Sequence, residues 1–225
     1  MANPVQSRSP QLECRPVAAF EQGDLASVRE AMNGAASCDL GQSWLAEPER
    51  DFVPGTVRVG RRHNVLVMLA ELTDRDIFSA ATGPNQRLWE LGDVFEVFLR
   101  PETQRAYVEL QIAPNNQRLQ LRYADENALK RARETKSLDG ALVGRELFQS
   151  NVWAQTPEQK WWVLAMIPAD SACEQPGGLA GSEWRFSFGR YDYTRGRRGP
   201  VISSSSAHTR VDFHRQEEWG ILRFS

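Results

Sequence analysis

Two carboxylates on neighbouring predicted strands are the residues of this sequence best suited to chemistry. Glu96 lies in the middle of an alternating apolar run, and Glu109 occupies a similar place in the run that follows. Two acids that face each other across a groove have the residue types of a glycosidase acid/base pair. We expect Arg118 and Arg122, on the next strand, to share that face and neutralise the acids in a cross-strand charge ladder. A glycoside hydrolase that uses Glu96 and Glu109 is therefore the weaker alternative.

Other catalytic and metal-binding patterns in the sequence are weak. His208 and His214 flank Asp212, but their spacing matches no known metal-binding pattern. The sequence contains no P-loop, no G-x-S-x-G and no G-x-G-x-x-G motif. The serines at 203–206 have no adjacent base, and we expect them to be solvated. No catalytic residue is assigned, and we expect a protein that is not an enzyme.

The runs that carry the two acids read as strands. Residues 105–123 form two alternating runs around a turn signal at 114–116, which predicts two half-buried antiparallel strands. Residues 56–74 predict two more strands around a turn at 61–64. Further runs lie at 151–155, 160–168, 184–191 and 218–224. About eight to ten short strands without a sustained helical pattern favour an all-β, antiparallel β-sandwich.

Helical segments are expected only at the periphery of the sandwich. The stretch DLASVREAM (24–32) places Asp24 at an N-cap position before an apolar stripe, which predicts a short helix. The charged segment 125–140 is expected to be an exposed connection with at most one helical turn. We predict an N-terminal tail and short helix over 1–36 and one β-sandwich domain over 37–225.

Composition excludes several classes of function. The 225 residues carry a formal net charge of −2, with 41% hydrophobic and 25% charged residues, which is typical of a soluble globular protein. No global positive field favours nucleic acid, and we expect the arginine-rich loop at 195–199 to be solvated. No apolar run approaches the roughly 20 residues of a membrane-spanning helix. We therefore expect no nucleic-acid and no membrane partner, and the composition sets no oligomeric state.

Cysteine usage bears on the compartment. Cys14, Cys38 and Cys173 are odd in number and widely spaced, so they form neither a disulfide framework nor a metal site. Free thiols are typical of a reducing compartment. The N-terminus also lacks the apolar core of a signal peptide. We expect a cytoplasmic protein, or a secreted one if an N-terminal segment has been removed.

The order of motifs along the chain is more informative than any single one. In chain order the motifs are HNVLVMLAELTDRDI, LWELGDVFEVFLRPETQRAYVELQIAPNNQ, KWWVLAMIP, WRFSFGRYDY and FHRQEEWGILRF. This series resembles the family 9 carbohydrate-binding modules, which belong to the wider group of DOMON-like sandwiches. The resemblance covers about residues 37–225. It implies a jellyroll-like β-sandwich that binds a mono- or oligosaccharide and does no chemistry.

The resemblance also implies site residues. In the family's sugar-binding members two tryptophans sandwich a terminal sugar ring, and charged side chains bind its hydroxyl groups. The positions that match, or that follow on the same face, are Trp89 as the first wall, Glu96 as the acidic acceptor, Tyr107, Glu109 and Gln111 on the next strand, and Arg190. The family's second tryptophan would fall at 200–209, which contains no aromatic residue. Tyr191, Tyr193 and Trp44 are the candidates for that wall.

The physical requirements of a sugar site agree with this assignment. An indole gives a flat apolar face for ring C–H groups, and carboxylates and guanidinium groups bind neighbouring hydroxyls. We expect polar residues 118, 120 and 122 to extend this face. A structural calcium ion is also implied, with Asp74 and Asp76 as weak candidate ligands and no other cofactor. The incomplete sandwich leaves the sugar open and keeps one alternative, an interaction or scaffold domain that has lost sugar binding.

Overall fold

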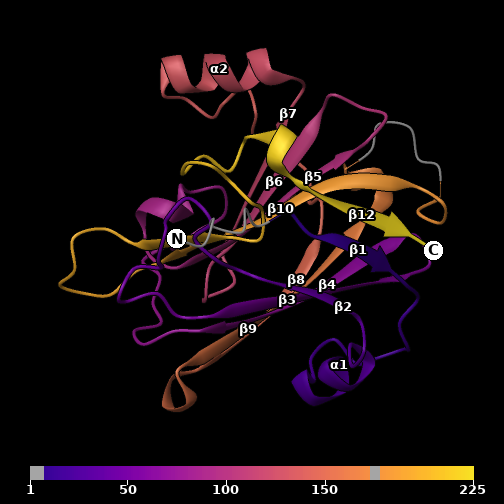
Figure 1. The fold of residues 1–225 in the computed structure, drawn as a ribbon, viewed down its shortest axis with the longest axis horizontal. Coiled ribbons are helices and arrows are strands. Elements are labelled where there is room, and N and C mark those ends of the chain that lie inside the picture. Colours follow the sequence, from indigo (N-terminus) through magenta and orange to yellow (C-terminus); the bar gives the residue numbers. More distant parts are fainter. Residues whose placement is uncertain (1–7, 173–177) are drawn as a thin grey trace, which may run out of the picture.

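Two β-sheets face each other in a sandwich, as the alternating sequence pattern predicts (Figure 1). The computed structural model describes residues 8–172 and 178–225. The first sheet has the order β1-β12-β10-β5-β6-β7, with β11 also paired to β10, and the second has the order β2-β3-β4-β9-β8. The strands of the first sheet are β1 (Gln11–Cys14), β5 (Val94–Pro101), β6 (Tyr107–Ile112), β7 (Arg118–Tyr123), β10 (Glu183–Asp192), β11 (Val201–Ser204) and β12 (Gly220–Phe224). Those of the second are β2 (Ala36–Asp39), β3 (Gly55–Arg62), β4 (Val65–Thr73), β8 (Gln149–Gln155) and β9 (Lys160–Pro168).

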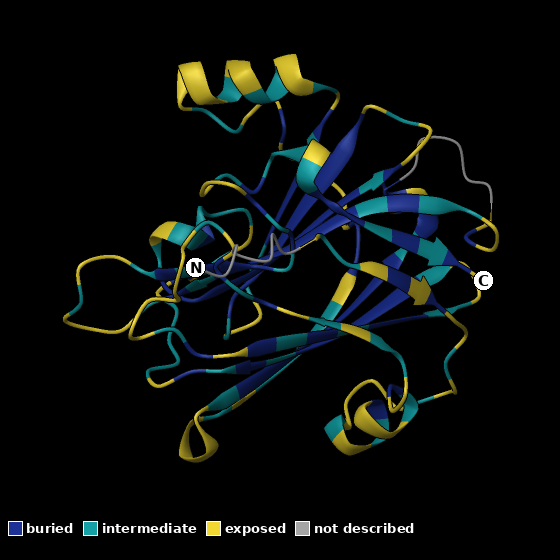
Figure 2. Ribbon diagram, viewed as in Figure 1, coloured by how far each residue is buried: buried dark blue, intermediate teal, exposed yellow. Residues whose placement is uncertain are grey.

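The core fills the space between the two sheets, and the buried segments run through their central strands (Figure 2). Strand β5 shows the alternation that makes this possible. Phe95, Val97 and Leu99 point into the core, whereas Phe98 belongs to a second apolar cluster on the outer face of the first sheet. Glu96 shares the outer face with Phe98, because side chains alternate along a strand. The outer face of β5 is therefore available for a site.

The two longest helices lie on the outer sides of the sandwich, one beside each sheet (Figure 1). Helix α1 (Leu25–Ala31) is capped by Asp24, whose Oδ1 accepts a hydrogen bond from the Ala26 amide at 2.9 Å, as predicted. Helix α2 (Glu126–Thr135) is longer than the single turn expected for this segment. The shorter helical elements are η1 (Leu88–Glu90), η2 (Thr156–Glu158), α3 (Ala169–Ala172) and η3 (Gln216–Glu218). No helix in the described ranges is long and apolar enough to cross a membrane.

The segment before residue 36 contributes to both sheets. Strand β1 pairs in parallel with β12, the last strand of the chain, and forms one edge of the first sheet. The Arg61 amide of β3 donates to the Arg15 carbonyl at 2.9 Å. Helix α1 covers the outer face of the second sheet, where Val28 packs with Val67 and Trp162. Cys173 lies outside the described residues.

Candidate functional site

The outer face of the first sheet carries a cavity of about 660 Å³. Helix α2 stands over this face, on the side away from the second sheet (Figure 1). The lining comes from β5, β6, β7 and β10, from the segment around η1, from α2 and from residues 210–214. It comprises Arg87, Trp89, Glu96, Phe98, Glu109, Gln111, Leu121, Tyr123, Leu129, Ala132, Arg133, Lys136, Leu138, Tyr191, Arg210, Val211, Asp212, Phe213 and His214. The volume falls within the range of about 300–1,000 Å³ typical of small-molecule sites.

A row of three polar side chains forms the floor of the cavity. The register of β5 and β6 sets Glu96 opposite Gln111 and Phe98 opposite Glu109. The Gln111 amide Nε2 donates to Glu96 Oε1 at 2.7 Å and to Glu109 Oε1 at 2.6 Å. Glu109 Oε2 and Gln111 Oε1 are buried and find no hydrogen-bond partner among the described residues. Buried polar atoms are normally paired, so these two oxygens are available to a further hydrogen-bond donor.

Burial changes the protonation of the two acids. Glu96 is 3% exposed and Glu109 is 4% exposed. Loss of solvent raises the pKa of Glu109 to about 7. Burial, together with the neighbouring charge of Glu109, raises the pKa of Glu96 well above its usual range. A protonated carboxyl can both donate and accept a hydrogen bond, which widens the set of hydroxyl orientations that the floor can bind.

Aromatic side chains stand beside this polar row. Trp89 of η1 is half-buried, and its carbonyl accepts a hydrogen bond from the Tyr193 hydroxyl at 2.5 Å. The Arg87 guanidinium lies 5.9 Å from the centroid of the Trp89 ring. Tyr191 of β10 meets Phe213 edge-on, with ring centroids 6.0 Å apart. The lining therefore includes one indole, that of Trp89, and two phenols, those of Tyr191 on β10 and Tyr123 on β7.

His214 is a lining residue that the sequence patterns did not place in the site. Its ring packs edge-on against Phe98, Tyr107 and Tyr123, with centroid distances of 5.2, 5.9 and 5.6 Å. The Tyr107 hydroxyl lies 2.8 Å from His214 Nδ1, and Nε2 is 3.6 Å from Glu109 Oε2. Burial lowers the pKa of His214 to about 3, so the ring is neutral near pH 7. No local signal relates residue 214 to β6, since the contact depends on the path of a distant loop.

Comparison with known proteins shows which solved structures share this architecture. No protein-family model matches the sequence, and no curated protein matches it. A solved structure of a candidate carbohydrate-binding protein from Bacteroides uniformis ATCC 8492 superposes with a TM-score of 0.69, at 17% identity over 96% of this chain and 100% of the other. A family 9 carbohydrate-binding module from Caldicellulosiruptor kristjanssonii matches with a TM-score of 0.63 and 14% identity, over 96% of this chain, in complexes with cellotriose and with glucose. These matches cover 94% and 96% of the module chain.

The chain has the fold of the family 9 carbohydrate-binding modules. Five of the residues predicted for a family 9-like site line the cavity, namely Trp89, Glu96, Glu109, Gln111 and Tyr191. Tyr107 is fully buried and reaches the cavity only through its contact with His214. Trp44 and Tyr193, the other candidates for a second aromatic wall, are not in the lining.

The charge ladder expected on this family 9-like face is wrong. Strand β7 sets Arg118 opposite Ile112 and Arg122 opposite Val108, so both arginines share the parity of core residues. Arg118 instead binds Glu146 at 2.6 Å, and Arg122 donates to the Ser171 carbonyl. Leu121 and Tyr123 face the cavity in their place. The sequence pattern predicts the alternation of β7 correctly but assigns its polar residues to the wrong face. Leu121 and Tyr123 occupy the outer face instead, because they are buried there beneath α2.

Arg190 lies on the inner face of β10 and not in the cavity. It is paired with Phe95, a core residue, and it is 1% exposed. Its guanidinium Nη2 lies 3.2 Å from Asp74 Oδ2 and 3.4 Å from Asp192 Oδ1. The role in sugar contact that the resemblance implies for Arg190 does not agree with this position. Its charge instead compensates buried acids inside the sandwich.

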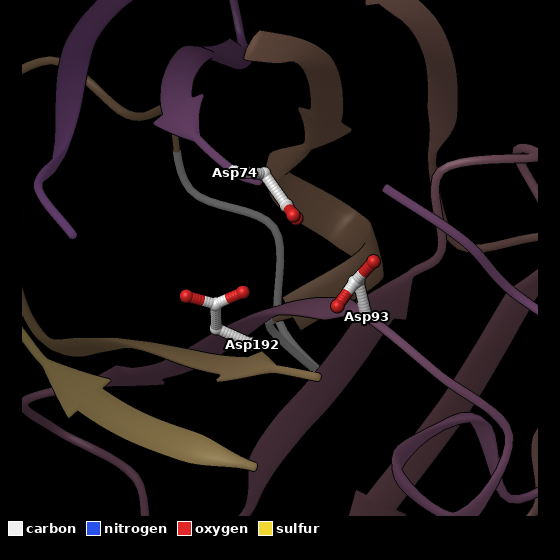
Figure 3. A group of neighbouring side chains, drawn as sticks. All are labelled: Asp74, Asp93 and Asp192. Carbon is white, nitrogen blue, oxygen red and sulfur yellow. The ribbon is translucent and has the colours of Figure 1, made fainter. Parts of the chain in front are cut away.

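Asp74, Asp93 and Asp192 form the acidic cluster that Arg190 meets, and their side chains converge from three segments (Figure 3). Asp93 accepts backbone hydrogen bonds from Phe78 and Tyr193. The Asp74 oxygens are also engaged, one by the Asp76 amide at 2.9 Å and the other by Arg190. Calcium requires six to eight oxygen ligands. A guanidinium beside oxygens that already accept hydrogen bonds fits such an ion poorly. Asp76 turns instead to Arg195, with which it forms an ion pair.

The serine segment is buried, contrary to expectation. Ser206 Oγ donates to Ser187 Oγ at 2.9 Å, and Ser187 Oγ lies 3.5 Å from His208 Nε2. His208 Nδ1 is 2.9 Å from Glu218 Oε2, which completes a serine–histidine–acid order. Ser187 has no exposed surface and His208 is 1% exposed. Without access to solvent, the Ser187 hydroxyl cannot meet a substrate. The network instead links β10 to both ends of the loop that carries Phe213 and His214.

Proposed function

We propose that the protein binds a carbohydrate in the cavity over β5 and β6 and performs no chemistry on it. The observation that carries the proposal is the row of Glu96, Gln111 and Glu109, which has two buried oxygens without a hydrogen-bond partner among the described residues and lines the same cavity as Trp89. Hydroxyl groups are the ligand groups that can both donate to and accept from such a row. The indole supplies the apolar face that ring C–H groups require. The cello-oligosaccharide complexes of the family 9 module support the same choice of ligand.

The expected affinity is modest. A typical net hydrogen bond contributes roughly 0.5–1.5 kcal/mol, and those to charged groups about 1.5–3 kcal/mol. A few such bonds and one stacked ring correspond to dissociation constants of about micromolar to millimolar. The single indole wall favours the weaker end of that range.

Glycoside hydrolysis is the less favoured function for Glu96 and Glu109. The Glu96 and Glu109 oxygens that share the Gln111 amide are close enough for a retaining mechanism, which uses carboxyl groups about 5–5.5 Å apart. Such a mechanism needs one protonated acid and one ionised nucleophile, with pKa values moved in opposite directions. Here burial raises the pKa of both Glu96 and Glu109. A pKa of about 7 leaves Glu109 only partly ionised near neutral pH, which disfavours it as the nucleophile.

Calorimetric titration with glucose, cellobiose and cellotriose tests the proposal. We expect heats of binding for wild type, and an affinity about tenfold lower for Glu96→Gln, because an amide cannot reproduce the donor and acceptor pattern of the carboxyl group toward the sugar hydroxyls. Glu13→Gln is the matched control, since Glu13 is an exposed acid of β1 in the same sheet and lies outside the cavity. Absence of binding by wild type at millimolar sugar, with the folded state verified by circular dichroism, would favour a scaffold domain. Release of product from a chromogenic glycoside, abolished in Glu109→Gln, would favour the hydrolase.

A further inference from the structure

Charge is distributed unevenly between the floor and the rim of the cavity. The acids of the floor, Glu96 and Glu109, are almost fully buried. Four cations line the cavity closer to solvent, namely Arg87, Arg133, Lys136 and Arg210. They come from three separate segments: the residues before η1, the C-terminal part of α2, and the loop after β11. The chain as a whole has a net charge of −2, so this concentration of positive charge does not follow from composition.

Two of the four rim cations are held by acids. Arg133 binds Asp212 at 2.7 Å, and Arg87 binds Glu90 at 3.3 Å. The side chains of Arg133 and Arg87 are still 53% and 39% exposed. Both therefore keep donors that can turn to a ligand.

Lys136 and Arg210 are exposed and form no ion pair with any other residue in the described ranges. Arg87 donates to the Lys136 carbonyl, which holds the end of α2 beside the segment that carries Trp89. Lys136 has a left-handed backbone (φ 54°) at the C-cap of α2, so its direction is set by the end of the helix. Lys136 thus stands on a fixed part of the rim, beside the segment that carries the indole wall.

We propose that the ligand of this cavity is an anionic sugar, whose carboxylate or phosphate group lies at the rim among Arg87, Arg133, Lys136 and Arg210 while its hydroxyl groups reach Glu96, Gln111 and Glu109. This inference rests on the proposed function, because it specifies the class of sugar for the same site. Guanidinium groups bind carboxylates and phosphates through paired, charge-assisted hydrogen bonds. The raised pKa values of Glu96 and Glu109 support the choice, since protonated acids on the floor repel an anion less than ionised ones.

Calorimetry with matched neutral and anionic sugars at pH 7 tests the inference. The probes are D-glucose, sodium D-glucuronate and glucose 6-phosphate, with sodium acetate as a control for simple ion binding. At about 20 mM ionic strength we expect at least one anionic sugar to bind about tenfold more tightly than glucose. The preference should fall to about threefold or less near 0.3 M salt, because exposed charges are screened at that ionic strength.

Two double variants separate the rim from charge in general. Lys136→Gln with Arg210→Gln should reduce the preference for the anionic sugar to within about twofold and leave the affinity for glucose unchanged. Lys130→Gln with Arg131→Gln removes the same charge from exposed positions of α2 that do not line the cavity, and should change neither affinity.

Each other outcome contradicts the inference in a recognisable way. Glucose binding without a preference for either anionic sugar would overturn it and leave the proposed function standing. Equal binding of acetate and glucuronate, or an equal loss in the two double variants, would overturn it as well. No binding of any of the three sugars would remove the proposed function together with the inference.

Discussion

Two buried acidic clusters lie on opposite faces of the first sheet, and they are completed in different ways. On the inner face, Asp74 and Asp192 share the Arg190 guanidinium, and Asp93 accepts two backbone amides. On the outer face, Glu96 and Glu109 share the neutral Gln111 amide, His214 Nε2 lies 3.6 Å from Glu109 Oε2, and both acids line a cavity. Neighbouring residues of β5 belong to different faces of the sheet. The Phe95 side chain lies on the inner face and the Glu96 side chain on the outer face.

The difference indicates which cluster serves stability and which serves binding. Buried ionised groups are tolerated when opposite charge and hydrogen bonds are supplied by the protein itself. The inner cluster receives opposite charge from Arg190, whose Nη2 lies close to Asp74 and Asp192 while its Nε and Nη1 find no hydrogen-bond partner among the described residues. The outer cluster is bridged by a neutral amide instead, and its acids line a cavity that is open to a ligand. Substitutions on the inner face should therefore alter stability alone, whereas those on the outer face should also alter binding.

Removal of Arg190 should give the largest effect. We expect Arg190→Met to lower the free energy of unfolding by about 3–5 kcal/mol, because loss of one partner leaves buried carboxylates without a compensating charge. Denaturation in urea measures this loss. Arg195→Met is the control, since the exposed Arg195–Asp76 pair should contribute less than about 1 kcal/mol. Equal effects of the two variants would show that the inner cluster is not held by Arg190.

The pH dependence of stability should separate the two clusters. The folded protein keeps the Glu109 proton up to about pH 7, whereas the unfolded chain releases it near the ordinary glutamate pKa of 4.5. The contribution of Glu109 to the free energy of unfolding is therefore complete below about pH 4.5 and is lost as the pH rises to about 7. We expect Glu109→Gln to be more stable than wild type at pH 8 by up to about 3 kcal/mol, at 1.36 kcal/mol per pKa unit.

Urea denaturation from pH 4 to pH 8 measures the difference between Glu109→Gln and wild type. The acids of the inner cluster titrate in both proteins, including Asp93, whose pKa burial raises to about 8. Their contribution cancels in the comparison, and the difference should vanish below about pH 4.5. Parallel profiles across this range would mean that Glu109 is already ionised in the folded protein.

The sequence predicted the fold better than it predicted the site. Alternation in β5 and β6 is regular, because each strand has one face in the core, and it correctly set Glu96, Glu109 and Gln111 on the outer face. The same rule assigned Arg118 and Arg122 to that face and failed, since β7 is an edge strand whose leucines pack beneath α2. An alternating pattern gives the period of a strand but not which face is covered.

The parts of the site that the sequence did not predict depend on long-range placement. His214 reaches β6 because a buried network around Ser187 and His208 holds its loop. Arg190 was expected in the cavity from its position in a motif, and only the register of β10 with β5 shows that it points inward. Motif spacing cannot distinguish these outcomes, because a buried ion pair and a ligand contact use the same residue types.

The smallest of these effects concerns the indole wall, and it tests whether the outer face is a binding surface at all. Trp89 and Trp44 both pack, half-buried, against the outer apolar cluster, but only Trp89 lines the cavity. Trp89→Ala should weaken sugar binding by about two- to tenfold, since an aromatic contact contributes roughly 0.5–1.5 kcal/mol beyond its buried area. Trp44→Ala should have a similar effect on stability and none on affinity. Equal loss of affinity in both variants would mean that the outer cluster acts through packing, and that Trp89 does not contact the sugar.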